Sequence, residues 1–157
     1  MILSGWRIAH PDFARTPEQM LSGEGAYLYG GRWNSRGVSM VYLGTSLAQA
    51  AMELLVHLDR HEVLEAYHKV QVSFEDALVS HIRIDDLPEN WATPSMASPV
   101  RQVGDRWVEE QVSVILQVPS ASIPGEYNFL LNPAHPDVDK LQVGPVSTFS
   151  YDPRLQK

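Results

Sequence analysis

The chain has 157 residues, of which 44% are hydrophobic and 20% charged, as expected for a globular domain with a core of its own. Its formal net charge of −7 argues against direct binding to nucleic acid, which needs a basic face, and no apolar run is long enough to cross a membrane. The absence of cysteine excludes disulfides and thiolate metal sites, and the amino-terminal segment does not resemble a signal peptide. We therefore expect one cytoplasmic domain over residues 1–157.

The amino-terminal part is predicted to be one strand followed by loops. Residues 2–8 form the strand, and Arg7 near its end either points into a site or lies at its rim. Residues 10–24 are expected to form a loop with a short helical turn, and residues 23–31 a glycine-rich turn beside a ligand or a neighbouring strand. These glycines do not fit the dinucleotide fingerprint, because the third is misplaced and no strand–turn–helix unit surrounds them.

A second strand is predicted over residues 38–43, and an amphipathic helix begins at Ser46. Ser46 and Gln49 fit a capping box, in which the serine accepts from a free backbone amide and the glutamine reaches back. Glu53 lies on the flank of the apolar stripe of this helix, where it is either a solvated glutamate or a carboxylate that faces a cleft at the edge of the core. The stripe consists of Leu47, Ala51, Leu54, Leu55 and Leu58.

The rest of the chain is predicted to contain further strands and one helix. Alternation along residues 66–74 places Val70, Val72 and Phe74 on one buried side. Residues 138–143 and 146–151 are expected to pair with each other at the end of the chain. The other segments are a strand at 79–84, a loop at 87–99, a helix at 100–110, a central strand at 112–118, and turns around a short apolar core at 124–136.

Three side chains on consecutive elements suit the cleavage of a dinucleotide. Arg32 can pair with phosphate oxygens through its guanidinium fork, and Tyr42 can stack on a flat ring and donate a hydrogen bond. Glu53 can accept from a ribose hydroxyl and stabilise positive charge on the sugar. A lone carboxylate suffices when the leaving group is nicotinamide, because the cationic ring departs neutral and needs no strong general acid. The pattern favours this chemistry without naming the substrate.

Other chemistries have less support in the sequence. The six histidines are scattered and form no H-E-x-x-H or comparable arrangement, so that no metal site is expected. There is no Walker-type phosphate loop. Ser120 does not lie in a G-x-S-x-G motif, which argues against a hydrolase triad.

Four segments of the chain carry a family resemblance: WRIAHPDF, GGRWNSRGVSMVYLGTSLAQAAMELLVHL, GDRWVEEQVSVILQVPSASIPGEYNFLLNPAHPD and FSYDPRL. Together they resemble the RES-domain family, the toxin half of bacterial RES–Xre type II toxin–antitoxin pairs, over almost the whole chain. The family is named for an arginine, a glutamate and a serine, which match Arg32, Glu53 and Ser120, and its tyrosine matches Tyr42. Ser122 lies close to Ser120, so the identity of the functional serine stays open.

The resemblance implies a fold similar to the ADP-ribosyltransferase toxins, an α+β single mixed domain with a split β-sheet core and flanking helices. It implies that NAD is consumed by cleavage of the nicotinamide–ribose bond, with water or phosphate as acceptor, which depletes NAD and arrests growth. Transfer of ADP-ribose to a cellular protein and a non-enzymatic partner-binding module are the alternatives. The implied partner is a cognate Xre-type helix-turn-helix antitoxin that covers the NAD cleft and contacts the DNA. Whether the chain forms a homodimer is left open.

The resemblance also suggests a role for each side chain toward NAD, which is the substrate. Arg32 anchors the diphosphate, and Tyr42 stacks near nicotinamide or its ribose. Glu53 holds this ribose and stabilises the cation, and Ser120 orients the glutamate or the amide. The pocket is completed by Arg7 or Asn128.

Overall fold

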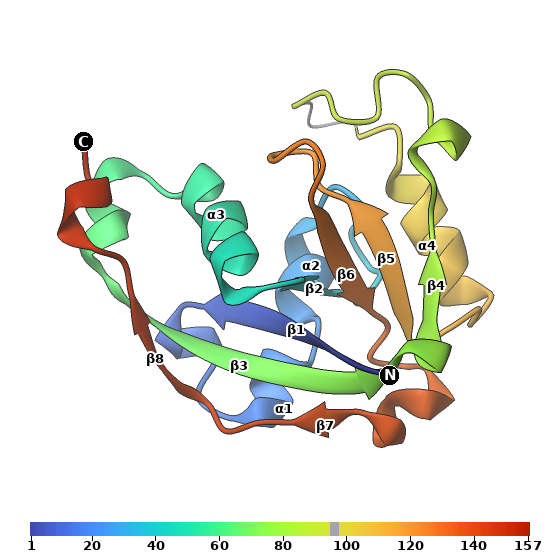
Figure 1. The fold of residues 1–157 in the computed structure, drawn as a ribbon, viewed down its shortest axis with the longest axis horizontal. Helices are drawn as coiled ribbons and strands as arrows, with labels where there is room; N and C mark the ends of the chain where they lie inside the picture. Colours follow the sequence, from blue (N-terminus) through green and yellow to red (C-terminus); the bar gives the residue numbers. More distant parts are fainter. Residues whose placement is uncertain (95–97) are drawn as a thin grey trace.

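The computed structural model, which describes residues 1–94 and 98–157, is organised around a mixed sheet of eight strands (Figure 1). Its order is β4-β5-β6-β2-β1-β3-β7, and β8 pairs with β3 beside this path. The strands are β1 (Ile2–Ala9), β2 (Val41–Gly44), β3 (Ala66–Glu75), β4 (Val79–His81), β5 (Ile115–Pro119), β6 (Tyr127–Leu131), β7 (Gln142–Val143) and β8 (Ser147–Ser150). The α-helices are α1 (Pro17–Met20), α2 (Glu24–Tyr29), α3 (Leu47–His57) and α4 (Arg101–Glu109).

The sheet is split between β1 and β2. These strands share a single register pair, Trp6 with Gly44, whereas β1 and β3 pair along the whole of β1. In Figure 1, β4, β5 and β6 accordingly run steeply, while β1 and β3 run nearly across the view. The expected α+β fold with a split sheet and flanking helices is therefore confirmed.

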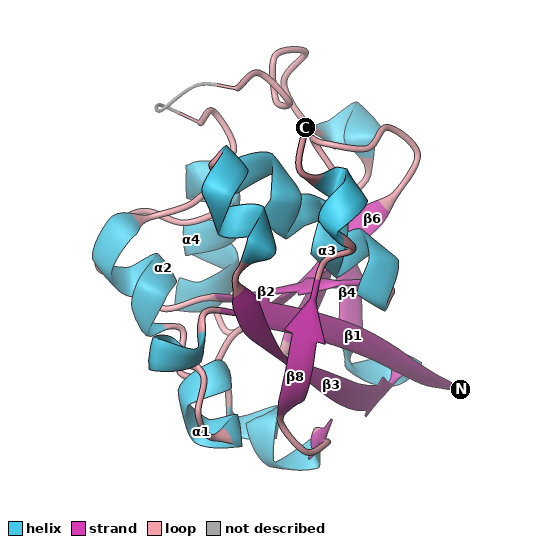
Figure 2. Ribbon diagram, turned by 90° about the vertical axis from the view of Figure 1, so that its left-hand side faces the viewer, coloured by secondary structure: helices cyan, strands magenta, loops and turns pink. Residues whose placement is uncertain are grey.

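Helix α3 lies across this junction and contacts both β1 and β2 (Figure 2). Its apolar stripe packs against Trp6 and Ile8 of β1. At the other side, Gly44 of β2 lies directly under the first turn of the helix, where an added Cβ would collide with the backbone of Ala50. The missing side chain at Gly44 thus lets the helix rest on the end of the strand.

Helix α4 covers the other half of the sheet. Trp107 of this helix packs with Trp33 and Met40 against buried residues of β5 and β6, including Leu116 and Leu130. Within the described residues, no helix has the length and apolar character needed to cross a membrane.

Several sequence predictions are confirmed by these elements. The first strand, the helix capped by Ser46 and the strand at 66–74 correspond to β1, α3 and β3. Val70, Val72 and Phe74 are all buried, as their alternation predicted. The helix at 100–110 corresponds to α4, and β5 has a neighbouring strand on each side, as predicted for a central strand. Residues 95–97 of the predicted loop lie outside the described residues.

Other predictions were wrong in informative ways. The glycine-rich segment is not a simple turn, because it contains α2, which begins after Gly23 in a left-handed conformation with φ of 71°. The segment around Phe129 is the strand β6, which pairs with both β2 and β5. The strands β7 and β8 both pair with β3 instead of with each other. The second and fourth predicted strands are shorter than expected, at Val41–Gly44 and Val79–His81.

Candidate active site

Hydrogen-bond donors from three parts of the chain surround the carboxylate of Glu53. Its Oε1 accepts from Ser120 Oγ at 2.5 Å, from Asn128 Nδ2 at 3.0 Å and from Gln49 Nε2 at 3.0 Å. Its Oε2 accepts from Ser122 Oγ at 3.3 Å. We call these five residues the Glu53 cluster. Two of them come from α3, one from β6, and the two serines from the segment after β5.

Local sequence explains how these side chains meet. Gln49 and Glu53 are four residues apart on α3 and therefore lie on the same side of the helix. Asn128 pairs with Gly44 across β2 and β6, which places it beneath the helix that rests on Gly44. Ser120 follows the end of β5, and its hydroxyl also accepts from the backbone N–H of Ile123 at 3.1 Å. The cluster therefore depends on strand register as much as on helical spacing.

The capping box predicted at the start of α3 is only half present. Ser46 Oγ accepts from the backbone N–H of Gln49 at 3.0 Å, as expected. The side chain of Gln49 does not reach back to the cap, because its amide donates to Glu53 and to Asn128 Oδ1. Gln49 is thus a residue of the site that local sequence rules assigned elsewhere; the signal that could have revealed it is its spacing from Glu53.

A second group, the glycine-turn cluster, consists of Gly31, Arg32, Asn34 and Tyr42. The Tyr42 hydroxyl accepts from the backbone N–H of Trp33 at 3.1 Å and donates to Asn34 Oδ1 at 2.6 Å. Burial raises the pKa of this phenol well above its ordinary value. A Cβ at Gly31 would lie 2.5 Å from the Tyr42 oxygen, so glycine is what allows the turn to close over the ring.

The guanidinium of Arg32 is bound to main-chain carbonyls. Its Nη1 donates to the carbonyl oxygens of Trp91 at 3.0 Å and Thr93 at 3.2 Å. Ser98 Oγ in turn donates to the carbonyl of Arg32 at 2.7 Å, and Arg101 Nε donates to that of Gly31 at 2.9 Å. Trp91 and Thr93 therefore accept from the glycine turn, whereas Ser98 and the first residue of α4, Arg101, donate to its main chain.

Strand register places one residue of each cluster, Tyr42 and Asn128, on one face of the sheet. Tyr42 pairs with Leu130 and Gly44 pairs with Asn128 in the antiparallel β2–β6 ladder. Tyr42 and Asn128 are therefore diagonal neighbours on the same face, about 7–8 Å apart at their backbones.

Arg7 lies apart from both clusters. Alternation along β1 places it on the face of Gly5 and Ala9, opposite the residues that pack against α3. Its Nε atom is buried and has no hydrogen-bond partner among the described residues. Burial lowers the pKa of this guanidinium. A buried cationic nitrogen without an acceptor suits an anionic ligand, because such groups are otherwise costly.

The predicted site residues differ in whether they contact Glu53. The structure brings Glu53, Ser120 and Asn128 into direct contact, and it places Tyr42 one diagonal step away. The two arginines, Arg7 and Arg32, lie outside this contact network in the part of the chain that is described. Both serines considered from the sequence reach Glu53, one at each carboxylate oxygen.

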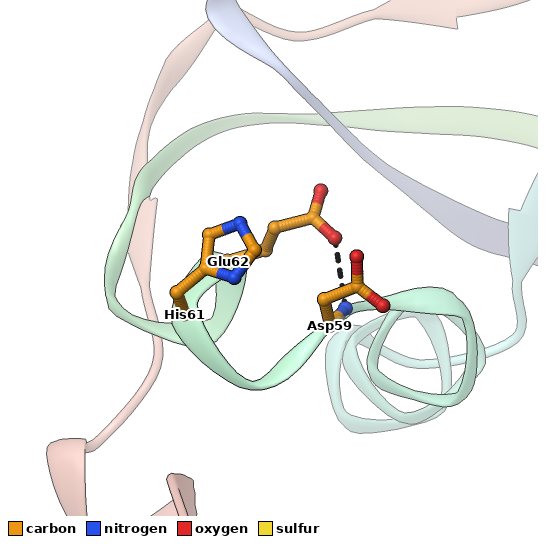
Figure 3. Close-up of side chains that lie close together, drawn as sticks. All are labelled: Asp59, His61 and Glu62. Atoms are coloured by element: carbon orange, nitrogen blue, oxygen red, sulfur yellow. Dashed lines mark hydrogen bonds between the residues drawn. The ribbon is translucent and has the colours of Figure 1, made fainter.

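Two other features of the surface resemble binding sites. Asp59, His61 and Glu62 present ligand-type atoms within 4.8 Å of one another, but they belong to one exposed turn in which Glu62 Oε1 accepts from the backbone N–H of Asp59 at 2.8 Å (Figure 3). This helix-capping contact accounts for their proximity. A hollow of about 280 Å³ lies between β4, β5 and α4, and none of the predicted site residues lines it.

Comparison with known proteins identifies the family. The sequence profile of the RES domain matches residues 4–152. The chain belongs to the RES domain family. Within this family, the protein named Toxin Res of Yersinia enterocolitica serotype O:8 is 36% identical over 137 residues, which cover 86% of this chain and 90% of that protein. The Prs ADP-ribosylating toxin of Sphingobium sp. (strain YBL2) is 36% identical over 159 aligned positions, which cover 99% of this chain and 98% of that protein.

A solved structure shares the fold of this RES domain. The crystal structure of the M. tuberculosis MbcT–MbcA toxin–antitoxin complex matches with a TM-score of 0.71 over 99% of this chain and 87% of that chain. The sequence identity is 17%, so this likeness concerns the fold alone.

Proposed function

We propose that this RES-domain protein is the toxin of a toxin–antitoxin pair and cleaves NAD at the nicotinamide–ribose bond. The observation that carries the proposal is the Glu53 carboxylate, which four side-chain donors hold in one orientation. A fixed negative charge is what a reaction through a cationic sugar requires, because such a charge needs no reorganisation as the cation forms. The protein acts in the cytoplasm, where loss of NAD stops growth.

In the proposed reaction, the bond between the ribose C1′ and the nicotinamide nitrogen breaks, and its electron pair stays on the nicotinamide. The ring changes from cationic to neutral, so this step needs no proton donor. Glu53 accepts a hydrogen bond from a ribose hydroxyl and stabilises the positive charge on the sugar ring. Water then bonds to C1′ and releases a proton to solvent, which leaves ADP-ribose; phosphate can take the place of water.

Arg32 is the proposed diphosphate ligand. Arg7 has a buried Nε without a partner among the described residues, but it lies on the face of β1 opposite α3, and no contact between it and this NAD is proposed. Arg32 exchanges the carbonyls of Trp91 and Thr93 for phosphate oxygens, because a charge-assisted hydrogen bond is stronger than one to a neutral carbonyl. Tyr42 lies between the glycine turn and Asn128 and presents its ring to the nicotinamide half.

Transfer of ADP-ribose to a cellular protein is the second candidate. It is supported by the Prs ADP-ribosylating toxin, which aligns with 99% of this chain at 36% identity. The first step is the same in both reactions, and only the acceptor that bonds to C1′ differs. A non-enzymatic partner-binding module is the remaining alternative.

The proposed partner is a cognate Xre-type helix-turn-helix antitoxin. The fold shared with the MbcT–MbcA toxin–antitoxin complex supports an antitoxin as partner. The net charge of −7 suits a division of labour in which the antitoxin alone contacts DNA.

Purified protein incubated with NAD labelled in the adenylate half tests the function. Free labelled ADP-ribose supports hydrolysis, its 1-phosphate supports phosphate as acceptor, and a labelled protein in added cell extract supports transfer. NAD that stays intact in buffer alone, with added phosphate and with added cell extract contradicts both enzymatic proposals. Glu53→Ala is the control: it should keep the wild-type circular dichroism and lose NAD consumption, and consumption at the wild-type rate would remove Glu53 from the reaction.

A further inference from the structure

Gln49 is a buried side chain that the proposed reaction uses only as one of the four donors to Glu53. It lies on α3 and is 5% exposed. Its amide nitrogen donates both to Glu53 Oε1 at 3.0 Å and to Asn128 Oδ1 at 3.1 Å. One side chain thus contacts two other members of the Glu53 cluster.

The contact with Asn128 determines which way the asparagine amide faces. Because Asn128 Oδ1 accepts from Gln49, its Nδ2 is the atom that faces Glu53, to which it donates at 3.0 Å. The opposite orientation would bring the asparagine carbonyl against the carboxylate and its amino group against that of Gln49. Gln49 therefore makes the donating orientation the favourable one.

The two oxygens of Glu53 are left unequal by this arrangement. Oε1 has three donors at 2.5 to 3.0 Å, one of them the buried Ser120 hydroxyl. Oε2 has the Ser122 hydroxyl at 3.3 Å, and Ser122 is only partly buried. A carboxylate held at Oε1 keeps Oε2 oriented, and the contact of Oε2 with Ser122 is the longest of the four.

We propose that Gln49 is a positioning residue that commits Oε1 to the protein and directs Oε2 to the substrate. A ribose hydroxyl then replaces the Ser122 hydroxyl at Oε2. This inference rests on the proposed cleavage of NAD. Gln49 touches neither substrate nor reacting atoms and acts through Glu53 and Asn128.

Gln49→Met tests this role, because methionine has a similar length and no donor. The matched control is Gln102→Met, at an exposed glutamine of α4. We expect kcat for NAD to fall about ten- to hundredfold, the loss of a hydrogen bond to a charged group, with KM within about threefold of wild type. A kcat equal to that of Gln102→Met would overturn the inference. If Gln49→Met does not fold, Gln49→Ala is measured with the same expectations.

A double-mutant cycle separates positioning from packing. If Gln49 acts through the asparagine, Gln49→Met combined with Asn128→Ala should lose less kcat than the product of the two single losses. Losses that multiply would overturn the inference. Failure of the two proposals is distinguishable: wild-type protein that leaves NAD intact contradicts the function itself, whereas active wild-type, inactive Glu53→Ala and fully active Gln49→Met contradict only the role of Gln49.

Discussion

The Glu53 cluster and the glycine-turn cluster contain similar polar side chains and use them differently. In the Glu53 cluster, two amides and two hydroxyls converge on one charged side chain. In the glycine-turn cluster, side chains bond largely to the main chain: Arg32 to the carbonyl of Trp91, Tyr42 to the N–H of Trp33, and Asn34 to the carbonyl of Ala26.

This difference indicates that the Glu53 cluster orients a charge for the reaction, whereas the glycine-turn cluster fixes the path of the main chain. Donors that converge on a carboxylate orient a charge, and the loss of any one changes what that charge can do. Side chains that bond to backbone groups fix the path of the chain, and their loss leaves buried polar groups unpaired. Substitutions in the Glu53 cluster should therefore alter turnover, whereas those in the glycine-turn cluster should alter binding and stability.

The largest effect is expected for Glu53→Gln. The amide keeps the size of the side chain and an acceptor for the three donors, but it removes the negative charge. We expect the rate of NAD consumption to fall by about 10²–10³-fold, the usual cost of losing electrostatic stabilisation of a transition state. Initial rates measure this effect, and urea unfolding should show nearly unchanged stability. An unfolding curve that collapses with the activity would make Glu53 a structural residue.

Arg32→Ala is expected to weaken NAD binding more than turnover. The loss of a charged hydrogen-bond pair to phosphate corresponds to about 1.5–3 kcal/mol, or about ten- to hundredfold in affinity. Both arginine substitutions are made in the inactive Glu53→Ala protein, so that no NAD is consumed. Titration calorimetry then compares the affinity of each double variant for NAD with that of Glu53→Ala alone. Arg36→Ala, at an exposed arginine of the same loop, is the control and should bind normally. Equal affinity for both variants would restrict Arg32 to its contacts with Trp91 and Thr93.

Tyr42→Phe is expected to lower the free energy of unfolding by about 1–3 kcal/mol, because the backbone N–H of Trp33 and Asn34 Oδ1 lose their partner. Urea denaturation followed by tryptophan fluorescence measures the change. Tyr127→Phe, at a tyrosine that is 40% exposed, removes a hydroxyl without this burial and should have little effect. Similar stability of the two variants would show that the glycine turn does not depend on the phenol.

The smallest effects should distinguish the two serines. Ser120 is 3% exposed, donates to Glu53 at 2.5 Å and accepts from Ile123, whereas Ser122 donates at 3.3 Å. We expect Ser120→Ala to reduce kcat about tenfold, at the lower end for a hydrogen bond to a charged group, and Ser122→Ala less than threefold, because its contact is longer. Steady-state kinetics of both variants measures the order, and the reverse order would make Ser122 the functional serine.

Sequence reasoning succeeded where one element determines its own pattern. The stripe on α3 and the alternation along β3 are local periodicities. The stripe packs, partly buried, against the core, and the predicted side of β3 is buried, although the buried residues of α3 are Gln49 and Ala50. It failed where partners lie far away in the chain. Nothing local to β7 and β8 indicates that both pair with β3, and the glycines around α2 are as typical of a turn as of a short helix.

The same distinction applies to the site. Glu53, Ser120 and Asn128 were proposed as site residues from the sequence, and the structure places them in contact. Gln49 was assigned to a capping box because that pattern needs only neighbouring residues. Its actual partner Asn128 is 79 residues away, and the register of β2 with β6 brings the two together.

The close approach of α3 to Gly44 has a consequence for how the carboxylate is located. Because main chain rests on main chain there, the helix cannot roll or slide toward the strand in the way that flexible side chains would permit. Glu53 therefore inherits its position from the scaffold itself. Substitutions in the pocket lining can leave the contact between Gly44 and the backbone of Ala50 intact. A methyl group introduced at Gly44 would displace α3 and, with it, the carboxylate of Glu53.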